Sequence, residues 1–277
     1  MNSRRSEVTS IDGEAAFALM EPLTDLVIEA GAAILAINRA YLNVEHKPDG
    51  SPLTEADLAA DRIILEGLTR IAPELPVLSE ERLEGAKPPS TGSFFLVDPL
   101  DGTREFVAGR DEFTVNVALV TNGVPLMGII GAPALGLVWR GLVGQGAERL
   151  ATGAKSSPEP IRTRSLPTSG EPWVAAVSRS HGDSRTDAFI AARPRAIRTP
   201  LGSAVKFARV AEGQVDIYPR LAPTSEWDVA AGHALVTAAG GKVTDSQGVA
   251  LRFGGGSAGF IVPEFIAWGD PSAAGGA

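Results

Sequence analysis

The 277-residue sequence contains no cysteine, and its histidines are His46, His181 and His233. The absence of cysteine excludes disulfides, thiolate zinc sites and a cysteine nucleophile, and it fits a reducing compartment. The scattered histidines share no motif, which argues against a phosphohistidine enzyme. No apolar run is long enough to span a membrane, and residues 1–13 lack the apolar segment of a secretory signal. We therefore expect a cytoplasmic protein, with a peripheral position at the cytoplasmic side of the inner membrane as an alternative.

Positive charge is also scarce, because the formal net charge is −8. A nucleic acid polymer is therefore not an expected partner. A small anionic substrate remains compatible if a metal ion or a local patch supplies positive charge. The length suits one or two domains. We expect a polar N-terminal tail (1–13), an N-terminal half (14–150), a C-terminal half (151–270) and a frayed tail (271–277).

One stretch, Phe94–Phe106, joins an apolar run to a cluster of turn residues. The apolar residues before Asp98 predict a buried strand, and Pro99 favours extended geometry up to that carboxylate. Asp101 follows on a turn, and Gly102 allows the backbone to approach a ligand closely. The N–H groups after Gly102 can begin a short helix and bind an anion there. The alternative is an ordinary turn, because Asp, Pro and Gly are common in turns.

Further acids stand at predicted strand ends and helix starts. Residues 80–81, two glutamates, follow a short apolar run, just as Asp98 does. Asp57 lies three positions after Thr54, and Asp228 lies three positions after Ser225. A carboxylate at this spacing completes a capping box. A purely structural role is therefore the alternative to a role in a site for both aspartates.

The remaining pattern predicts alternating helices and strands. A helix is expected from Pro22, in its first turn, to Tyr41. Residues 122–123, Asn-Gly, indicate a tight hairpin, and residues 145–169 are rich in Gly, Pro, Ser and Arg and indicate a junction between the halves. Further helices are expected over 54–68, 187–192, 202–213 and 225–239, and strands over 75–79, 94–98, 113–120, 126–131, 137–142, 173–178 and 214–218.

If these acids converge, their mutual repulsion calls for a cation. All candidate ligands are oxygen donors, which suit Mg²⁺, Mn²⁺ or Ca²⁺ rather than zinc or copper. Asp98 and Asp101 are close enough in sequence to bridge two ions, which lie about 3.5–4 Å apart in two-metal sites. Such a pair of ions activates a water and stabilises the leaving oxygen of a phosphate ester. These residues therefore indicate a metal-dependent phosphatase.

Four motifs resemble those of the inositol monophosphatase family. Asp98–Thr103 resembles its first signature and Trp227–Gly232 its second, while Leu78–Glu81 and Thr54–Asp57 fall where the family places its other site acids. The resemblance is collinear from about residue 23 to residue 270. It implies an α/β fold with α-β-α-β-α layers. It also implies metal ligation by Glu80, Asp98, Asp101, Asp228 and the Leu100 carbonyl, catalytic roles for Asp57, Thr103 and Glu80, and substrate contacts from Asp101, Gly102, Thr103 and Asp228.

Within the family, the chain is most similar to the bisphosphate nucleotidases. The supporting residues are Arg104–Phe106, Glu112–Val117, Gly202–Phe207, Ala211–Gln214, Tyr218–Arg220 and His233. Two departures, Ala204 and Val262-Pro263, fall near the presumed nucleoside side. The resemblance implies removal of the 3′-phosphate of adenosine 3′,5′-bisphosphate by an enzyme with two or three Mg²⁺ ions, replaceable by Mn²⁺, and inhibition by lithium. We expect a monomer or homodimer. A phosphatase for inositol or sugar phosphates is the alternative, and a non-catalytic binding protein is a third reading.

Substrate choice is expected to depend on the second half of the chain. Gly202 and Ser203, at a predicted helix start, offer N–H and hydroxyl donors to a ribose or a second phosphate. Lys206 adds a positive charge that a bisphosphate would use. The alternative for Lys206 is an exposed charge on a surface helix. His233 is expected near the same side, although a lone histidine on a helix is more often simply packed.

Overall fold

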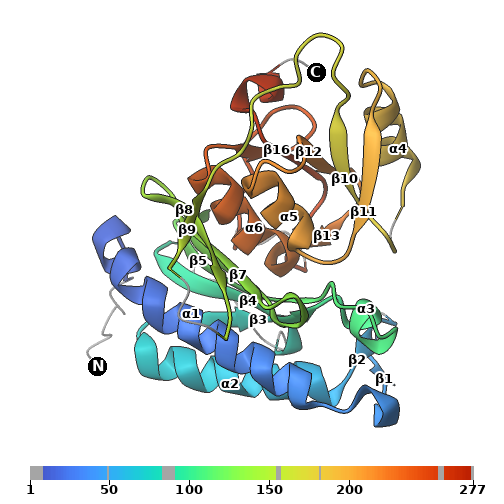
Figure 1. The fold of residues 1–277 in the computed structure, drawn as a ribbon. Coiled ribbons are helices and arrows are strands. Elements are labelled where there is room, and N and C mark those ends of the chain that lie inside the picture. The colour runs from blue at the N-terminus through green and yellow to red at the C-terminus, as the bar shows by residue number, and fades with distance from the viewer. Residues whose placement is uncertain are drawn as a thin grey trace.

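A computed structural model describes residues 9–48, 50–82, 91–153, 157–180, 182–254 and 259–275. Its elements form five layers, with helices and sheets alternating through the molecule (Figure 1). From one side to the other these layers are α1 and α2, a seven-stranded sheet, α5 and α6, a five-stranded sheet, and α4. The helix bounds are α1 (Gly13–Ala36), α2 (Glu55–Ile71), α3 (Thr103–Val107), α4 (Ser184–Ala191), α5 (Val205–Ala211) and α6 (Glu226–Ala238). The α-β-α-β-α order agrees with the expected architecture.

The larger sheet has the strand order β3-β4-β5-β6-β7-β8-β9. Its pairs are antiparallel except for β3 with β4, which run parallel, so the ends of these two strands meet at one edge. The bounds are β3 (Val77–Ser79), β4 (Ser93–Asp101), β5 (Thr114–Thr121), β6 (Val124–Ala132), β7 (Leu137–Leu142), β8 (Gly146–Ala151) and β9 (Glu159–Ile161).

The smaller sheet has the order β11-β10-β12-β16-β14, with β10 parallel to both β11 and β12. Its bounds are β10 (Val174–Ser178), β11 (Ile197–Leu201), β12 (Ile217–Arg220), β14 (Lys242–Thr244) and β16 (Phe265–Trp268). Two strand pairs lie outside both sheets, β1 (Glu45–His46) with β2 (Pro52–Leu53) and β13 (Thr224–Ser225) with β15 (Ile261–Val262). Single 3₁₀ turns are η1 (Arg39–Tyr41), η2 (Glu80–Arg82), η3 (Pro133–Leu135) and η4 (Pro271–Gly275).

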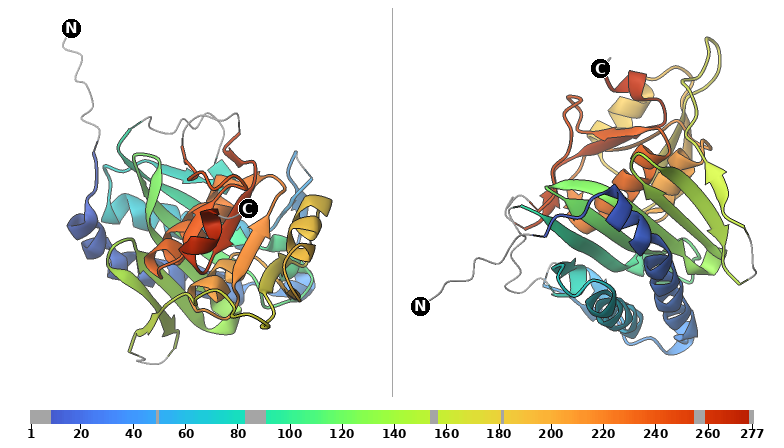
Figure 2. Two further views of the ribbon diagram at one scale, coloured as in Figure 1. Left: turned by 90° about the horizontal axis from the view of Figure 1, so that it is seen from above. Right: turned by 90° about the vertical axis from the view of Figure 1, so that its left-hand side faces the viewer.

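Strand β4 is continuously hydrophobic from Phe94 to Val97 because both of its faces are covered there. Phe95 and Val97 pack toward α1 and α2, whereas Phe94 and Leu96 pack toward α5 and α6. Figure 2 shows the same arrangement from two further directions, with α1 and α2 on one side of the larger sheet and the smaller sheet on the other. Helix α6 lies so close to β6 that a Cβ at Gly128 would sit 2.1 Å from a carbonyl oxygen of α6. The layers therefore fix α6 closely against the sheet.

The first helix differs from its prediction at both ends. It begins at Gly13, because the Asp12 side chain accepts a hydrogen bond from the N–H of Ala15 and caps the helix there. Pro22 lies inside α1 rather than in its first turn. The helix ends at Ala36, and the residues up to Tyr41 form the separate turn η1. The expected span of 22–41 was therefore wrong by several residues at each end.

Two segments expected to lack regular structure have some. The predicted junction, 145–169, contains β8 and the edge strand β9, whose mixture of charged, small and proline residues resembles a loop in composition. The predicted frayed tail begins with η4, where Ala274 packs beside Trp268 in a small core cluster. The smaller sheet also has strands that the pattern missed, β11, β14 and β16. The division into halves at 150 stays a prediction.

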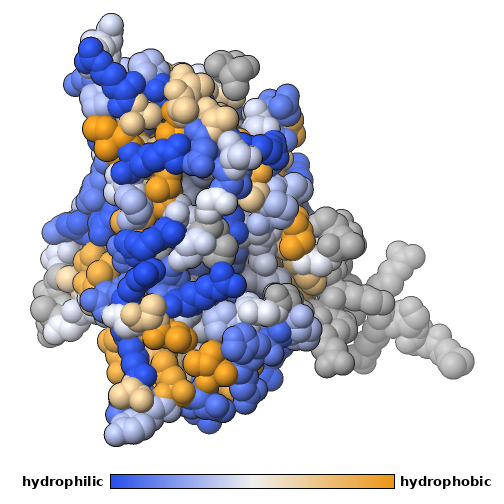
Figure 3. All heavy atoms as spheres, turned by 90° about the vertical axis from the view of Figure 1, so that its right-hand side faces the viewer, coloured by the Kyte–Doolittle hydropathy of each residue, from blue (hydrophilic) through white to orange (hydrophobic). Residues whose placement is uncertain are grey.

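Helices long and apolar enough to cross a membrane are absent from the described part of the chain. On the face shown in Figure 3, hydrophilic side chains cover much of the middle, and hydrophobic ones gather more densely below.

Candidate active site

The site is built at the end of β4. Strand β4 extends past Pro99 to Asp101, and its pairing with β5 is irregular between Asp98 and Asp101. The backbone N–H of Leu100 donates to Asp98 Oδ1 at 3.0 Å. Gly102 then has a φ of 93°, in the left-handed region that glycine tolerates best, and α3 begins directly after it. The strand-to-helix transition was predicted at the right residues, but the strand ends three residues later than expected.

Three carboxylates from separate elements meet at this strand end. One oxygen each from Glu80, Asp98 and Asp228 lies within 4.8 Å of the others. Glu80 comes from η2, directly after β3, while Asp98 lies in the neighbouring strand β4 and Asp228 in the first turn of α6. The parallel pairing of β3 and β4 therefore brings two of these acids together, and α6 brings the third. The convergence predicted for the strand-end acids is present in the structure.

The cluster carries repulsion that nearby positive charge offsets only in part. Burial, together with the charges of Glu80 and Asp101, raises the pKa of Asp98 well above its usual range. Burial also raises the pKa values of Glu80 and Asp101 to about 7, and the nearby charge of Asp228 adds to both shifts. A cation bound among these oxygens would remove the repulsion. The donors are all oxygen atoms, so the residues fit a hard divalent ion.

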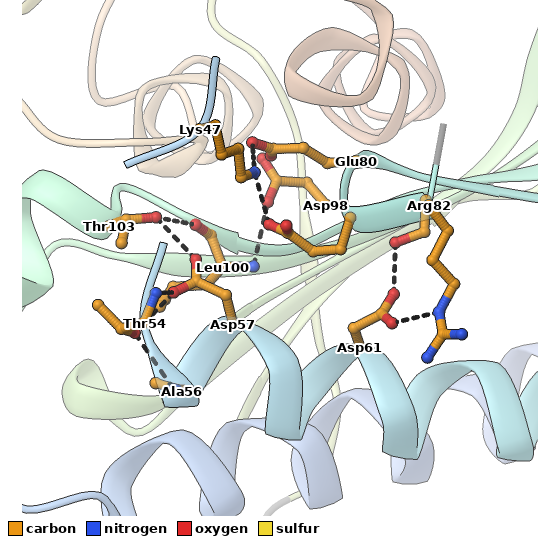
Figure 4. Close-up of polar contacts among 12 residues, drawn as sticks. Lys47, Thr54, Ala56, Asp57, Asp61, Glu80, Arg82, Asp98, Leu100 and Thr103 are labelled. Carbon is orange, nitrogen blue, oxygen red and sulfur yellow. Dashed lines mark hydrogen bonds and ion pairs between the residues drawn. The ribbon is translucent and has the colours of Figure 1, made fainter. Parts of the chain in front are cut away.

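Lys47 supplies one positive charge beside the cluster. Its Nζ lies 2.6 Å from Glu80 Oε1 and 2.7 Å from Glu81 Oε1 (Figure 4). Burial opposes a charge on this side chain, but the two glutamates outweigh burial and raise the pKa of Lys47 above its usual value. The local sequence pattern around Lys47 indicates no such pairing, because the partners lie more than thirty residues away.

Asp57 closes a helix cap and also contacts Thr103, a residue of the cleft. Its Oδ2 accepts hydrogen bonds from the N–H and the hydroxyl of Thr54, at 2.8 and 2.6 Å, which completes a capping box at the start of α2. Its Oδ1 lies 2.9 Å from the Thr103 hydroxyl (Figure 4). Burial raises the pKa of Asp57 above its usual value. The two readings left open by the sequence, cap and site residue, are therefore compatible.

Asp228 repeats this arrangement on α6. Its Oδ2 accepts a hydrogen bond from the N–H of Ser225 at 3.3 Å and a short one from the hydroxyl of Thr224. Asp101, the remaining predicted ligand, accepts a hydrogen bond from Asn116 Nδ2 at 3.3 Å. Asp98, Asp101 and Asp228 are thus each held in place by hydrogen-bond donors.

A cleft of about 210 Å³ lies beside these acids. Its lining brings together most residues predicted from the sequence, namely Glu80, Asp98, Leu100, Asp101, Gly102, Thr103, Gly202, Ser203, Lys206 and Asp228. Asp57 lies behind Thr103. His233 is buried on α6 with its ring against Phe253, outside the described lining of the cleft, so its expected place near the substrate was wrong.

The second half of the chain contributes positive charge to the cleft. Lys206 is only 4% exposed, so the reading of this residue as an exposed surface charge was wrong. Its Nζ lies 5.3 Å from the centre of the Tyr218 ring and 3.5 Å from the Leu201 carbonyl oxygen, and burial lowers its pKa to about 8. Arg220, not predicted as a site residue, also lines the cleft, and its Nε is buried without a hydrogen-bond partner among the described residues.

The two sides of the cleft touch directly. The N–H of Gly202 donates to Glu112 Oε2 at 2.8 Å, and Arg179 forms an ion pair with the same carboxylate. A Cβ at Gly202 would lie 2.5 Å from the backbone oxygen of Glu112. Ser203 follows with a φ of 42°, and its buried hydroxyl meets no partner in the described residues. The predicted helix therefore begins later than expected, at Val205.

Comparison with known proteins agrees with this geometry. The model of the inositol monophosphatase family matches residues 18–269. The chain belongs to the inositol monophosphatase family. This membership confirms the expected fold class and the expected phosphatase class of enzyme.

Several bacterial members of the inositol monophosphatase family are similar along nearly their whole length. The 3′(2′),5′-bisphosphate nucleotidase CysQ of Salmonella typhimurium is 39% identical over 243 residues, which cover 85% of this chain and 94% of that protein. CysQ of Escherichia coli K12 is 37% identical over 238 residues, with the same coverage. The crystal structure of CysQ from Bacteroides thetaiotaomicron has a TM-score of 0.71 and 32% identity, covering 90% of this chain and 96% of that one.

Proposed function

We propose that this protein removes the 3′-phosphate of adenosine 3′,5′-bisphosphate, giving AMP and phosphate, in a Mg²⁺-dependent reaction. The observation that carries the proposal is the shared cleft, in which three converging carboxylates face two cationic side chains, Lys206 and Arg220. The similarity to proteins named 3′(2′),5′-bisphosphate nucleotidases supports the same substrate.

The acids would hold the metal. Glu80, Asp98, Asp101, Asp228 and the Leu100 carbonyl supply oxygen ligands for two or three Mg²⁺ ions, which Mn²⁺ can replace. When bound, these ions activate a water and stabilise the leaving oxygen of the ester. Burial and the charge of Asp228 raise the pKa values of Glu80 and Asp101 even though Lys47 lies beside Glu80 and Lys206 lowers the pKa of Asp101, and a bound divalent ion would add the further positive charge.

The Asp57–Thr103 pair orients the attacking water. The Thr103 hydroxyl donates to Asp57 Oδ1 at 2.9 Å, so its oxygen lone pairs are left to accept a hydrogen from water in the cleft. Thr54 fixes Asp57 from the other side. The backbone N–H groups of Gly102 and Thr103, at the start of α3, are suited to hold the reacting phosphate.

Lys206 and Arg220 form the candidate site for the second phosphate. Burial depresses the pKa of Lys206 to about 8, so its charged form gains from an anionic partner. Arg220 adds a fixed charge with an unpaired Nε–H. Ser203 completes this side with a buried hydroxyl that lacks a described partner, whereas the Gly202 N–H, expected as a donor to the substrate, is already taken by Glu112.

A substrate panel tests the proposal. With Mg²⁺, kcat/KM for adenosine 3′,5′-bisphosphate is expected to exceed that for inositol 1-phosphate by at least ~10-fold, or about 1.4 kcal/mol of transition-state discrimination. Inositol and sugar phosphates are the alternative substrates, and a preference for inositol 1-phosphate would support that alternative. Excess EDTA is expected to abolish turnover with every substrate, and turnover that survives it would contradict the metal site.

Several properties follow from the proposal and stay predictions. A role in sulfur metabolism and nucleotide recycling, inhibition by lithium, a cytoplasmic location and a monomeric or homodimeric state all belong to this group.

A further inference from the structure

A second carboxylate on α2, Asp61, lies one helical turn after Asp57 and on the same face of the helix. Asp61 is 2% exposed, and each of its oxygens accepts a hydrogen bond from a different side chain. The Ser79 hydroxyl donates to Oδ1 at 2.6 Å, and Arg82 Nε donates to Oδ2 at 2.6 Å. Figure 4 shows Asp61 and Arg82 beside the Asp57–Thr103 pair, with Glu80 above them. The side chain of Asp61 points toward the end of β3 and the turn η2 rather than into the acid cluster.

The two partners of Asp61 stand on either side of the segment that carries Glu80. Ser79 is the last residue of β3, and Arg82 is the last residue of η2. Between them, Glu80 belongs to the acid cluster, and Glu81 pairs with Lys47. Two consecutive residues, Glu80 and Glu81, thus lie between two hydrogen bonds that end on one buried carboxylate.

We propose that Asp61 is a positioning residue for the metal site, because it fixes the turn that presents Glu80 to the divalent ion. The proposal rests on the metal site described under the proposed function. One face of helix α2 then fixes two parts of the site. Asp57 holds the water-positioning pair, and Asp61 holds the turn that carries the metal ligand Glu80. Groups that orient metal ligands typically contribute 10- to 100-fold to metal affinity or activity.

The charge of Asp61 suits this role. Arg82 neutralises the buried carboxylate of Asp61 by a direct contact, so Asp61 does not need the metal ion as a counter-charge. The hydroxyl of Ser79 occupies the other oxygen. Replacement by asparagine keeps the shape and one acceptor oxygen, but it places an NH₂ group against either the Ser79 hydroxyl or the Arg82 Nε–H.

The test is a direct measurement of metal binding, with Mn²⁺ as the probe and electron paramagnetic resonance of the free ion as the readout. Asp61→Asn is expected to weaken Mn²⁺ binding by about 10-fold or more. Turnover is expected to recover toward wild type at saturating Mn²⁺, with the KM for adenosine 3′,5′-bisphosphate unchanged. The milder variants Ser79→Ala and Arg82→Gln each remove one of the two contacts and are expected to weaken binding by a smaller factor, even if Asp61→Asn does not fold.

Asp216→Asn is the matched control. Asp216 is also a buried acid paired with an arginine, Arg164, but it lies in the smaller sheet region outside the described lining of the cleft. This control is expected to lose stability without losing Mn²⁺ affinity. Mn²⁺ affinity within twofold of wild type in all three variants at Asp61, Ser79 and Arg82 would overturn the positioning role, as would an equal loss in Asp216→Asn. A wild-type protein that binds no Mn²⁺ would instead refute the proposed metal site itself.

Discussion

Replacing Asp101 with asparagine separates the role of this residue in metal binding from its effect on stability. In the metal-free protein, burial and the charge of Asp228 raise the pKa of Asp101 from 3.8 to about 7. Between these two pH values the folded state keeps the proton while the unfolded chain loses it, so wild-type stability falls as pH rises through this window. At about 1.4 kcal/mol per pH unit, the full effect above pH 7 is about 4 kcal/mol.

Asparagine carries no charge and is similar in shape, so Asp101→Asn avoids this loss. Part of the gain is offset because the hydrogen bond from Asn116 changes its partner atom. We expect the metal-free variant to be more stable than wild type by about 2–4 kcal/mol at pH 8, which is a rise of roughly 5–10 °C in Tm. At pH 5.5, about half of this gain in stability is expected, because this pH lies about midway between the two pKa values of Asp101.

Thermal unfolding in EDTA and in Mg²⁺ measures both effects. In EDTA the variant is expected to melt above wild type. In Mg²⁺ the order is expected to reverse, because the variant lacks a ligand oxygen, and activity is expected to fall by at least ~100-fold. A lower Tm for Asp101→Asn in EDTA at pH 8 would show that the residue is mainly structural, and the charge-repulsion reasoning would then be wrong.

Three further predictions concern the second half of the chain. Lys206→Met keeps the buried stem but removes the charge, so it should shrink the kcat/KM ratio between adenosine 3′,5′-bisphosphate and inositol 1-phosphate, mainly by slowing the bisphosphate; an unchanged ratio contradicts this. Gly202→Ala places a Cβ against the Glu112 backbone, so urea unfolding should show a loss of about 1–3 kcal/mol. Burial lowers the pKa of His233 to about 4, so stability should fall by up to ~3 kcal/mol as pH drops from 6.5 toward 4, and urea titrations of His233→Gln should show a smaller slope.

The strand-end acids could be predicted from the sequence because their signals are local. The apolar run before Asp98 and the spacing of Thr54 to Asp57 each occupy only a few residues, and each motif formed where its pattern indicated. The extension of β4 through Pro99 was not predictable in this way. A proline ends a strand only where its missing N–H would be needed, and here the pairing with β5 is already irregular.

The burial of individual side chains could not be predicted from the sequence. The stretch around Lys206 looks the same whether the helix is exposed or buried, and only the packing of α5 between the two sheets decides it. Arg220 was not predicted because only the folded chain brings it beside the cleft, and the pairing of Lys47 with Glu80 and Glu81 was not predicted because it joins residues more than thirty positions apart. Strands β8 and β9, the last two of the larger sheet, were missed because partly exposed strands carry the polar composition of loops.

The two capping boxes limit which substitutions, insertions and deletions this sequence can accept. Asp57 and Asp228 each close the first turn of a helix and also belong to the site, so one carboxylate satisfies two requirements. Asparagine would keep the cap but not the charge, while a glutamate could still close a capping box, but its longer side chain would move the carboxylate away from its present place in the cluster. In a saturation library these positions should therefore tolerate almost no replacement, whereas Thr54 should accept serine. Loss of one residue within the first turn, between the cap residue and its aspartate, would shift the aspartate by about 100° around the helix, so insertions and deletions within the first turns of α2 and α6 should be nearly absent among active variants.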